Sequence, residues 1–193
     1  MAVSSTMLDL GTQAPEFRVT DVVTGKTLTL SDFSSDKLFL VIFLCRHCPY
    51  VKHVEGELAR IGAEYRPKGV GIIGISSNDA DKYPDDAPAS LKEWAGILKF
   101  NFPIAHDASQ EAAKAYRAAC TPEFYLFNAQ RKLIYRGQLD DSRPKNTEPI
   151  TGKDLRQALE AGLKGQPLSP DQKPGIGCNI KWKPGREPDY FAL

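Results

Sequence analysis

Two long apolar runs interrupt an otherwise mixed pattern of hydrophobic and polar positions along the chain. Residues 38–44 are apolar throughout, and residues 70–76 are apolar apart from two glycines and a final serine. A half-exposed strand alternates apolar and polar residues, whereas a strand that is covered on both faces of its sheet is continuously apolar. We therefore predict two buried strands at the centre of a sheet.

Helical spacing follows the first of these runs, over about residues 49–65. The apolar stripe of this segment consists of Val51, Val54, Leu58 and Ile61. These residues recur three or four positions apart, which places them on one face of a helix. Pro49 suits the first helical position, where a backbone N–H has no partner to lose.

Three further helices are predicted from spacing and from capping residues. They cover residues 91–99, residues 110–118, and a segment from Thr151 or Asp154 to about Gly165. Ser90 and Glu93 form a capping box in front of the first of these helices. Ser109 occupies the corresponding cap position of the second helix.

Two pairs of short extended segments predict β-hairpins. Residues 17–19 and 26–30 flank one turn, and residues 124–127 and 132–135 flank another. Together with the alternation of strands and helices, these hairpins predict an α/β fold. We expect a central mixed β-sheet flanked by helices, with the first pair as an extra N-terminal β-hairpin.

The two ends of the chain show no periodicity. Residues 1–9 predict a loose N-terminal arm. Residues 166–193 are rich in proline and glycine and predict an irregular C-terminal tail packed on the domain. No composition shift indicates a second domain, so residues 1–193 are expected to form one.

Length and composition favour a packed protein. The chain has 193 residues, and 41% of them are hydrophobic, as in a folded interior. The net charge of +1 argues against nucleic acid or a membrane surface as partner. No apolar run approaches the roughly 20 residues that span a bilayer, and the N-terminus lacks the pattern of a secretory signal. We therefore expect a cytoplasmic protein.

The cysteines carry the candidate chemistry. Cys45 and Cys48 lie between the predicted buried strand and the predicted helix over residues 49–65. A thiolate at a helix N-terminus is stabilised by free backbone N–H groups and by the helix dipole. Cytosolic cysteines stay reduced unless they do redox or metal chemistry, so the pair indicates a redox site rather than a structural disulfide.

Four motifs spread over about residues 10–165 point to one family. They are G-x-x-A-P-x-F at residues 11–17, L-S-D-F at residues 30–33, CRHCPYVK at residues 45–52, and Cys-Thr-Pro at residues 120–122. With these motifs the chain resembles the thioredoxin-like superfamily, and within it the redoxin or alkyl hydroperoxide reductase/thiol-specific antioxidant (AhpC/TSA) branch. Residues 175–185 resemble the tail of a small subgroup of probable thiol-disulfide isomerases whose active site reads C-x-H-C-P-Y-V.

The resemblance implies which cysteine attacks. Counting from the strand phenylalanine, Phe43, to the nucleophile of thioredoxins leads to Cys48 rather than Cys45. The usual position of the resolving cysteine then falls on Val51. The resemblance therefore implies a Cys45-x-x-Cys48 pair in which Cys48 is the nucleophile and Cys45 resolves the mixed disulfide.

The resemblance also implies a substrate-binding edge at Thr121 and Pro122. Proteins of this fold carry a cis proline there, and its backbone edge receives an incoming peptide or thiol substrate. Cys120 lies two residues before the proline, where it is either a second resolving thiol or, as we expect, a core cysteine. Cys178 in the tail either returns to the site or, as we expect, is structural.

Besides Cys120, two polar residues near the pair are candidate accessory groups. His47, between the cysteines, either supports the thiolate or is a solvent-facing spacer. Lys52, on the predicted helix, adds positive charge near its N-terminus. With His53, the residues of this region also form a soft-ligand set for copper or zinc: Cys45, His47, Cys48 and His53.

These features predict a thiol–disulfide oxidoreductase that acts on protein or small-molecule disulfides and depends on a thiol reductant system. The alternative is a peroxiredoxin-like antioxidant peroxidase with Cys48 as the peroxidatic cysteine. A copper- or zinc-binding chaperone of this fold and a non-catalytic interaction module remain as further alternatives. We expect no cofactor and no resident metal.

Overall fold

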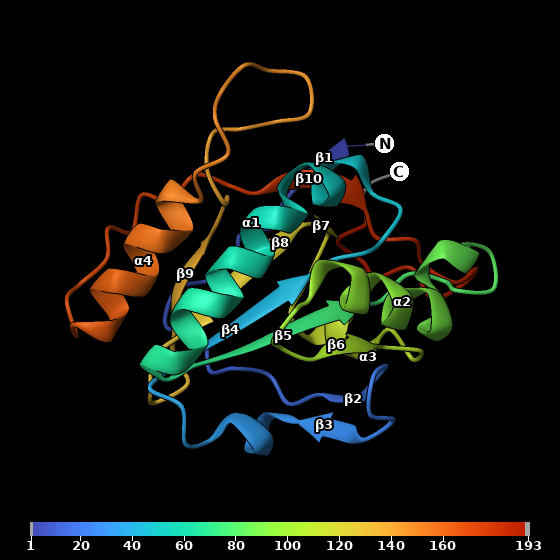
Figure 1. The fold of residues 1–193 in the computed structure, drawn as a ribbon, viewed down its shortest axis with the longest axis horizontal. Coiled ribbons are helices and arrows are strands. Elements are labelled where there is room, and N and C mark those ends of the chain that lie inside the picture. Colours follow the sequence, from blue (N-terminus) through green and yellow to red (C-terminus); the bar gives the residue numbers. More distant parts are fainter. Residues whose placement is uncertain (1, 192–193) are drawn as a thin grey trace.

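A seven-stranded mixed sheet forms the centre of the protein, in the order β3-β2-β6-β5-β4-β8-β9 (Figure 1). The computed structural model describes residues 2–191. The strands of this sheet are β2 (Arg18–Asp21), β3 (Thr27–Thr29), β4 (Leu38–Phe43), β5 (Val70–Ser76), β6 (Ile104–His106), β8 (Glu123–Phe127) and β9 (Leu133–Gly137). The α-helices are α1 (Pro49–Tyr65), α2 (Pro88–Leu98), α3 (Glu111–Ala115) and α4 (Lys153–Leu163). Short 3-10 helices are η1 (Leu30–Phe33), η2 (Arg66–Lys68) and η3 (Pro84–Asp86).

The two apolar runs form the centre of the sheet, as predicted. β4 pairs in parallel with β5 and antiparallel with β8. Every residue of β4 and β5 is buried, which explains why neither run alternates. Both predicted hairpins are confirmed, since β2 pairs antiparallel with β3, and β8 with β9.

Helices α1, α2 and α4 cover one face of the sheet (Figure 1). The predicted stripe of α1 is buried in this layer: Val51, Val54, Leu58 and Ile61. On the other face, α3, η1, the N-terminal segment and the tail enclose a second, aromatic-rich cluster. Along β4, Leu40 and Ile42 belong to the helical layer, whereas Phe39 and Val41 belong to the aromatic cluster. This strand therefore connects the two halves of the core.

The two chain ends together form a second, three-stranded sheet, which corrects two predictions. β1 (Ala2–Ser4) pairs antiparallel with β10 (Ile176–Asn179), and β10 pairs antiparallel with β7 (Cys120–Thr121). The first described residues of the arm therefore form a strand, and the tail is not irregular throughout. The three strands are too short to show a periodicity of their own, and their partners lie far away in the sequence.

The starts of two helices differ from the predicted caps. α2 begins at Pro88, since proline suits the first helical position. No side chain caps this helix. Ser90 lies inside the first turn, where its hydroxyl accepts a hydrogen bond from Arg46 at 2.7 Å. α3 is shorter than predicted, because Gln110 before it (φ 63°) and Arg117 after it (φ 50°) adopt the left-handed conformation.

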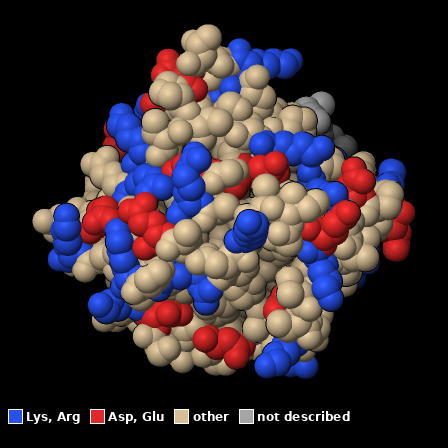
Figure 2. Space-filling model, viewed as in Figure 1, with Lys and Arg blue, Asp and Glu red and all other residues tan. Residues whose placement is uncertain are grey.

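Charges of both signs are interspersed over the face shown in Figure 2, and neither sign dominates it. This distribution matches the net charge of +1. Among the described residues, every helix is too short or too polar to cross a bilayer.

Candidate active site around Cys48

The cysteine pair lies where β4 and α1 meet. β4 ends at Phe43, and α1 begins at Pro49 with Cys48 as its N-cap in an extended conformation (φ −69°, ψ 123°). The prediction that the helix begins directly after Cys48, and not after Cys45, is therefore confirmed. The Cys48 sulfur lies at the free N–H groups of the first turn and accepts a hydrogen bond from the N–H of Val51.

Thr121 lies against both thiols of the pair. Its hydroxyl is 3.3 Å from Sγ of Cys45, and its carbonyl oxygen is 3.2 Å from Sγ of Cys48. The peptide bond between Thr121 and Pro122 is cis, as predicted. Both cysteines are 0% exposed and Thr121 is 2% exposed. The fold thus brings the predicted catalytic pair and the predicted substrate edge into one enclosed site.

A third thiol, that of Cys178, completes the site. β10 pairs with β7 so that Cys178 stands opposite Thr121. Its side chain packs on the helical layer of the core, the cluster that also contains Cys45 and Cys48. Unlike the other three cysteines, Cys178 is partly exposed. The pairing of β10 with β7 brings the tail back to the cysteine pair, which is the alternative to the structural role expected for Cys178.

The hydrogen bonds among these thiols separate their acidities. Bonds from the Cys178 and Cys45 thiols lower the pKa of Cys48 far below its ordinary value, although burial alone would raise it. The same bonds, together with desolvation, raise the pKa of Cys45 and of Cys178. These opposite shifts make Cys48 the most acidic of the three thiols and the one that most readily forms a thiolate.

His47 is paired with a buried aspartate, Asp86. Nδ1 of His47 lies 2.5 Å from Oδ2 of Asp86, and its ring stacks on Tyr83 with centroids 5.3 Å apart. The hydrogen bond to Asp86 raises the pKa of His47, and the charge of Cys48 adds to this effect. Burial acts to raise the pKa of Asp86, but hydrogen bonds from His47 and Asn78 lower it overall. These contacts hold the imidazole in place and favour its protonated form.

Asp86 also holds the backbone of the cysteine turn. Its Oδ1 accepts hydrogen bonds from the N–H groups of Arg46 at 2.8 Å and of His47 at 3.4 Å. The other oxygen accepts a bond from Nδ2 of Asn78 at 2.7 Å. Asp86 lies in η3, 40 residues after Arg46, within a segment whose sequence predicts only a polar loop. Sequence reasoning missed this residue because no local pattern connects the two segments.

The remaining accessory candidates lie around this site. Lys52 is exposed on α1. Cys120 is fully buried, with its sulfur 4.0 Å from the carbonyl oxygen of Pro122, and burial raises its pKa well above the ordinary value. The buried carboxyl group of Glu123 accepts hydrogen bonds from the N–H groups of Ala119 at 2.7 Å and Cys120 at 3.1 Å. Glu123, a second residue that sequence reasoning missed, thus supports the loop before the cis proline.

The described residues contain one group of potential metal ligands near the pair. The ligand atoms of Cys45, His47 and Asp86 lie within 4.8 Å of one another. Asp86 takes the place of Cys48 and His53 in the set predicted from the sequence. Because His47 and Asp86 share a hydrogen bond and the Cys45 thiol is protonated, a metal ion would have to displace both protons.

Comparisons with known proteins show what this chain is similar to. A family model described as the AhpC/TSA family matches residues 10–136. The thiol-disulfide oxidoreductase ResA of Bacillus thuringiensis is 27% identical over 159 residues, which cover 81% of this chain and 78% of that protein.

Two solved structures extend these comparisons to the fold. An uncharacterized conserved protein from Geobacillus kaustophilus is 52% identical, with a TM-score of 0.93 over 95% of this chain and 97% of that chain. A putative thiol:disulfide interchange protein DsbE from Chlorobium tepidum is 19% identical, with a TM-score of 0.63 over 81% of this chain and 99% of that chain. The likeness to the second structure confirms the predicted thioredoxin-like fold.

Proposed function

The chain belongs to the AhpC/TSA family, and from this membership we propose that it is a thiol–disulfide oxidoreductase whose redox pair is Cys45 and Cys48. Cys48 is the nucleophile, and Cys45 is the resolving thiol. The substrates are protein or small-molecule disulfides, and a thiol reductant system restores the pair. The observation that carries the proposal is the Cys48 sulfur at the N-cap of α1, with the sulfurs of Cys45 and Cys48 both in contact with Thr121.

The reaction begins with attack of the Cys48 thiolate on one sulfur of a substrate disulfide. The S–S bond of the substrate breaks, and its second sulfur leaves as a thiolate that takes up a proton. Cys45 then loses its proton and attacks the Cys48 sulfur, which releases the remaining substrate thiol. The substrate has gained two electrons, and the protein holds a Cys45–Cys48 disulfide.

Two neighbours assist these steps. The hydroxyl of Thr121, 3.3 Å from the Cys45 sulfur, can donate a hydrogen bond to Cys45 as its thiolate forms. His47, kept protonated by Asp86, places a positive charge near Cys48 and so favours the thiolate over the thiol. Both residues support thiol–disulfide exchange at the buried pair.

Stoichiometric oxidation tests this function. The reduced protein is mixed with oxidised glutathione, and both the glutathione released and the disulfides in the protein are measured. We expect the wild-type protein to form a Cys45–Cys48 disulfide and Cys48→Ser to form none. Cys120→Ala is the matched control, because it removes a buried thiol of the neighbouring loop, and it should react like the wild type.

Two results would contradict the proposal. If Cys48→Ser is oxidised as fast as the wild-type protein, Cys48 is not the nucleophile. If the reduced protein consumes hydrogen peroxide rapidly and leaves disulfides untouched, the peroxidase alternative replaces the proposed activity, with a sulfenic acid expected on Cys48.

A further inference from the structure

The strand β10 occupies the edge that is predicted to receive a substrate. Cys178 stands opposite Thr121 in antiparallel register, and Asn179 stands opposite Cys120. On its other side β10 pairs with β1, and in Figure 1 it lies close to the N-terminal end of α1. The tail therefore presents Cys178 to Cys48 in the place where a substrate strand would present its own cysteine.

Gly177 permits this close approach of the tail. A Cβ atom built at Gly177 would lie 1.9 Å from the carbonyl oxygen of Thr121 and 3.1 Å from the nitrogen of Pro122. Any other residue at this position would therefore push β10 away from the site. At Gly175, by contrast, the nearest atom to a built Cβ is a backbone oxygen at 3.4 Å, which is an ordinary contact.

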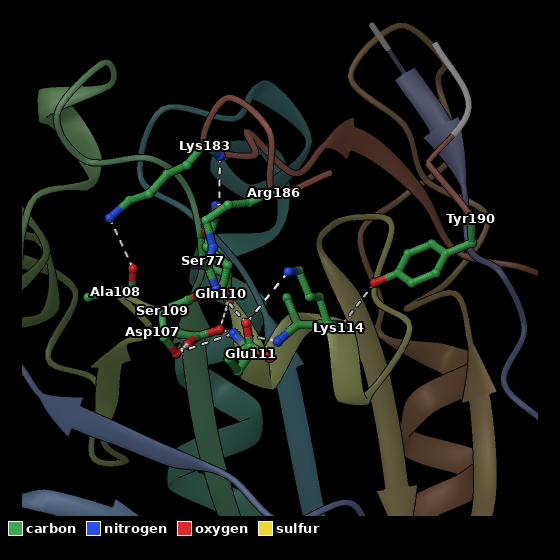
Figure 3. A network of polar contacts seen from close by, with 11 residues as sticks. Ser77, Asp107, Ala108, Ser109, Gln110, Glu111, Lys114, Lys183, Arg186 and Tyr190 are labelled. Carbon is green, nitrogen blue, oxygen red and sulfur yellow. Dashed lines mark hydrogen bonds and ion pairs between the residues drawn. The ribbon is translucent and has the colours of Figure 1, made fainter. Parts of the chain in front are cut away.

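The segments on both sides of β10 are fixed to the domain. Before the strand, Oε1 of Gln172 accepts a hydrogen bond from the N–H of Arg136 at 3.0 Å. After it, the N–H of Lys183 donates to Oε1 of Gln110 at 2.9 Å, and Arg186 forms an ion pair with the first residue of α3 at 2.5 Å (Figure 3). These contacts hold Cys178 beside Cys48.

Cys178 differs from Cys45 and Cys48 in its exposure to solvent. Cys45 and Cys48 are 0% exposed, so the direct attack of Cys48 on a substrate disulfide requires β10 to move away from the site. Cys178 is partly exposed, and it stands opposite Thr121, whose carbonyl oxygen lies 3.2 Å from the Cys48 sulfur. It is therefore the thiol that connects the buried pair with the solvent.

We propose that Cys178 is a third redox thiol, which carries electron pairs between the buried Cys45–Cys48 pair and small thiols or disulfides in solution. This inference rests on the proposed function of the pair. Through Cys178, a substrate in solution exchanges electrons with Cys45 and Cys48 without contacting them.

Each step of this route is a thiol–disulfide exchange. Cys178 passes its proton to Cys48 and attacks an external disulfide, RSSR, whose S–S bond breaks to release one RSH after protonation. Cys48 then attacks the Cys178 sulfur and gives the proton it accepted to the departing thiolate, which releases the second RSH and leaves a Cys48–Cys178 disulfide. Finally Cys45 attacks the Cys48 sulfur, and its proton passes to Cys178. The net change is two electrons and one proton from the pair to RSSR, and the second proton comes from water.

Disulfide mapping in a Cys45→Ser variant tests whether the Cys48–Cys178 disulfide forms as an intermediate. The full-length variant is oxidised with oxidised glutathione, its remaining thiols are blocked, and unreduced peptides are identified by mass spectrometry. We expect a disulfide between the peptides that contain Cys48 and Cys178. Adding Gly177→Ala should lower its yield, whereas the matched control Gly175→Ala should leave the yield unchanged. Oxidation that leaves Cys48 and Cys178 unlinked would overturn the proposal.

The rate of oxidation gives an independent test in which the active pair stays intact. Because the other thiols are buried, Cys178→Ser should slow formation of the Cys45–Cys48 disulfide by oxidised glutathione by about tenfold or more. An unchanged rate refutes the role of Cys178 and leaves the oxidoreductase proposal standing. If the wild-type protein forms no Cys45–Cys48 disulfide at all, the proposed function itself fails.

Discussion

Asp86→Asn tests how strongly the active-site turn depends on one buried carboxylate. The replacement keeps the shape of the side chain and removes its charge. The remaining oxygen can still accept the N–H groups of Arg46 and His47. The new amide nitrogen, however, faces the side-chain nitrogens of His47 and Asn78, which donate to the wild-type carboxylate.

The two lost contacts set the expected magnitude. His47 loses a charged partner, but its neutral tautomer can accept a hydrogen bond from the new amide. The side-chain N–H₂ group of Asn78 then faces the new amide N–H₂ group, and neither can accept a hydrogen bond. The Asn78 amide cannot rotate to avoid this, because its Oδ1 already accepts the N–H of Lys181 at 2.8 Å. A hydrogen bond to a charged group contributes about 1.5–3 kcal/mol, and an unpaired buried donor costs about 1–3 kcal/mol. We expect Asp86→Asn to lower the free energy of unfolding by about 2–4 kcal/mol.

The loss should depend on pH in a defined direction. The raised pKa of His47 contributes stability below its unfolded value of about 6.5, and this contribution disappears as pH rises through the folded pKa. The lowered pKa of Asp86 contributes above its unfolded value of about 3.9, and this part disappears as pH falls through the folded pKa. The difference between wild type and variant should therefore be largest between about pH 4 and 6.5.

Urea unfolding of the reduced proteins at about pH 5.5 and about pH 9 measures both effects, since the pH values bracket the titration of His47. Asp85→Asn is the matched control, because it removes the exposed carboxylate next to Asp86 in the same 3-10 helix. It should change stability by less than about 0.5 kcal/mol. A loss in Asp86→Asn no larger than in this control, or equal losses at both pH values, would refute the reasoning.

The further predictions concern α1 and the thiolate at its start. Gly56→Ala should stabilise the protein by about 0.5–1 kcal/mol in thermal or urea unfolding, because a Cβ there meets open space. Gly62→Ala should instead destabilise it by about 1–3 kcal/mol, because the added carbon would lie 2.6 Å from the ring of Phe102. Leu58→Ala should cost about 2–5 kcal/mol in the same assay, since this side chain is 0% exposed in the helical layer. The ultraviolet absorbance of the Cys48 thiolate should persist into acidic pH and vanish in Cys48→Ser, and the difference in stability between the reduced wild type and Cys48→Ser should rise with pH from the lowered folded pKa up to about 8.5. A thiolate signal that appears only above about pH 8 would contradict the helix-start environment.

The parts of the fold that were predictable are those whose pattern is local. The continuous apolar runs of β4 and β5 and the stripe of α1 express burial directly in the order of residues, and Pro49 marks the first helical position. The family motifs then indicated that Cys48 starts the helix and that Thr121 precedes a cis proline. Capping was less predictable, because Ser90 has a hydroxyl suited to a cap but uses it to accept a hydrogen bond from Arg46.

The surroundings of the cysteine pair were decided by tertiary structure alone. Asp86 reaches the turn from η3, and Cys178 reaches it from a four-residue strand whose partners are the first and seventh strands of the chain. Neither contact leaves a local signal, because hydrogen bonds and strand pairing between distant segments require no periodicity in either segment. The sequence by itself therefore determined a thioredoxin-like core with a thiol at the start of α1. Folding determined which charges and thiols surround that sulfur, because it brings segments far apart in the chain within hydrogen-bond distance.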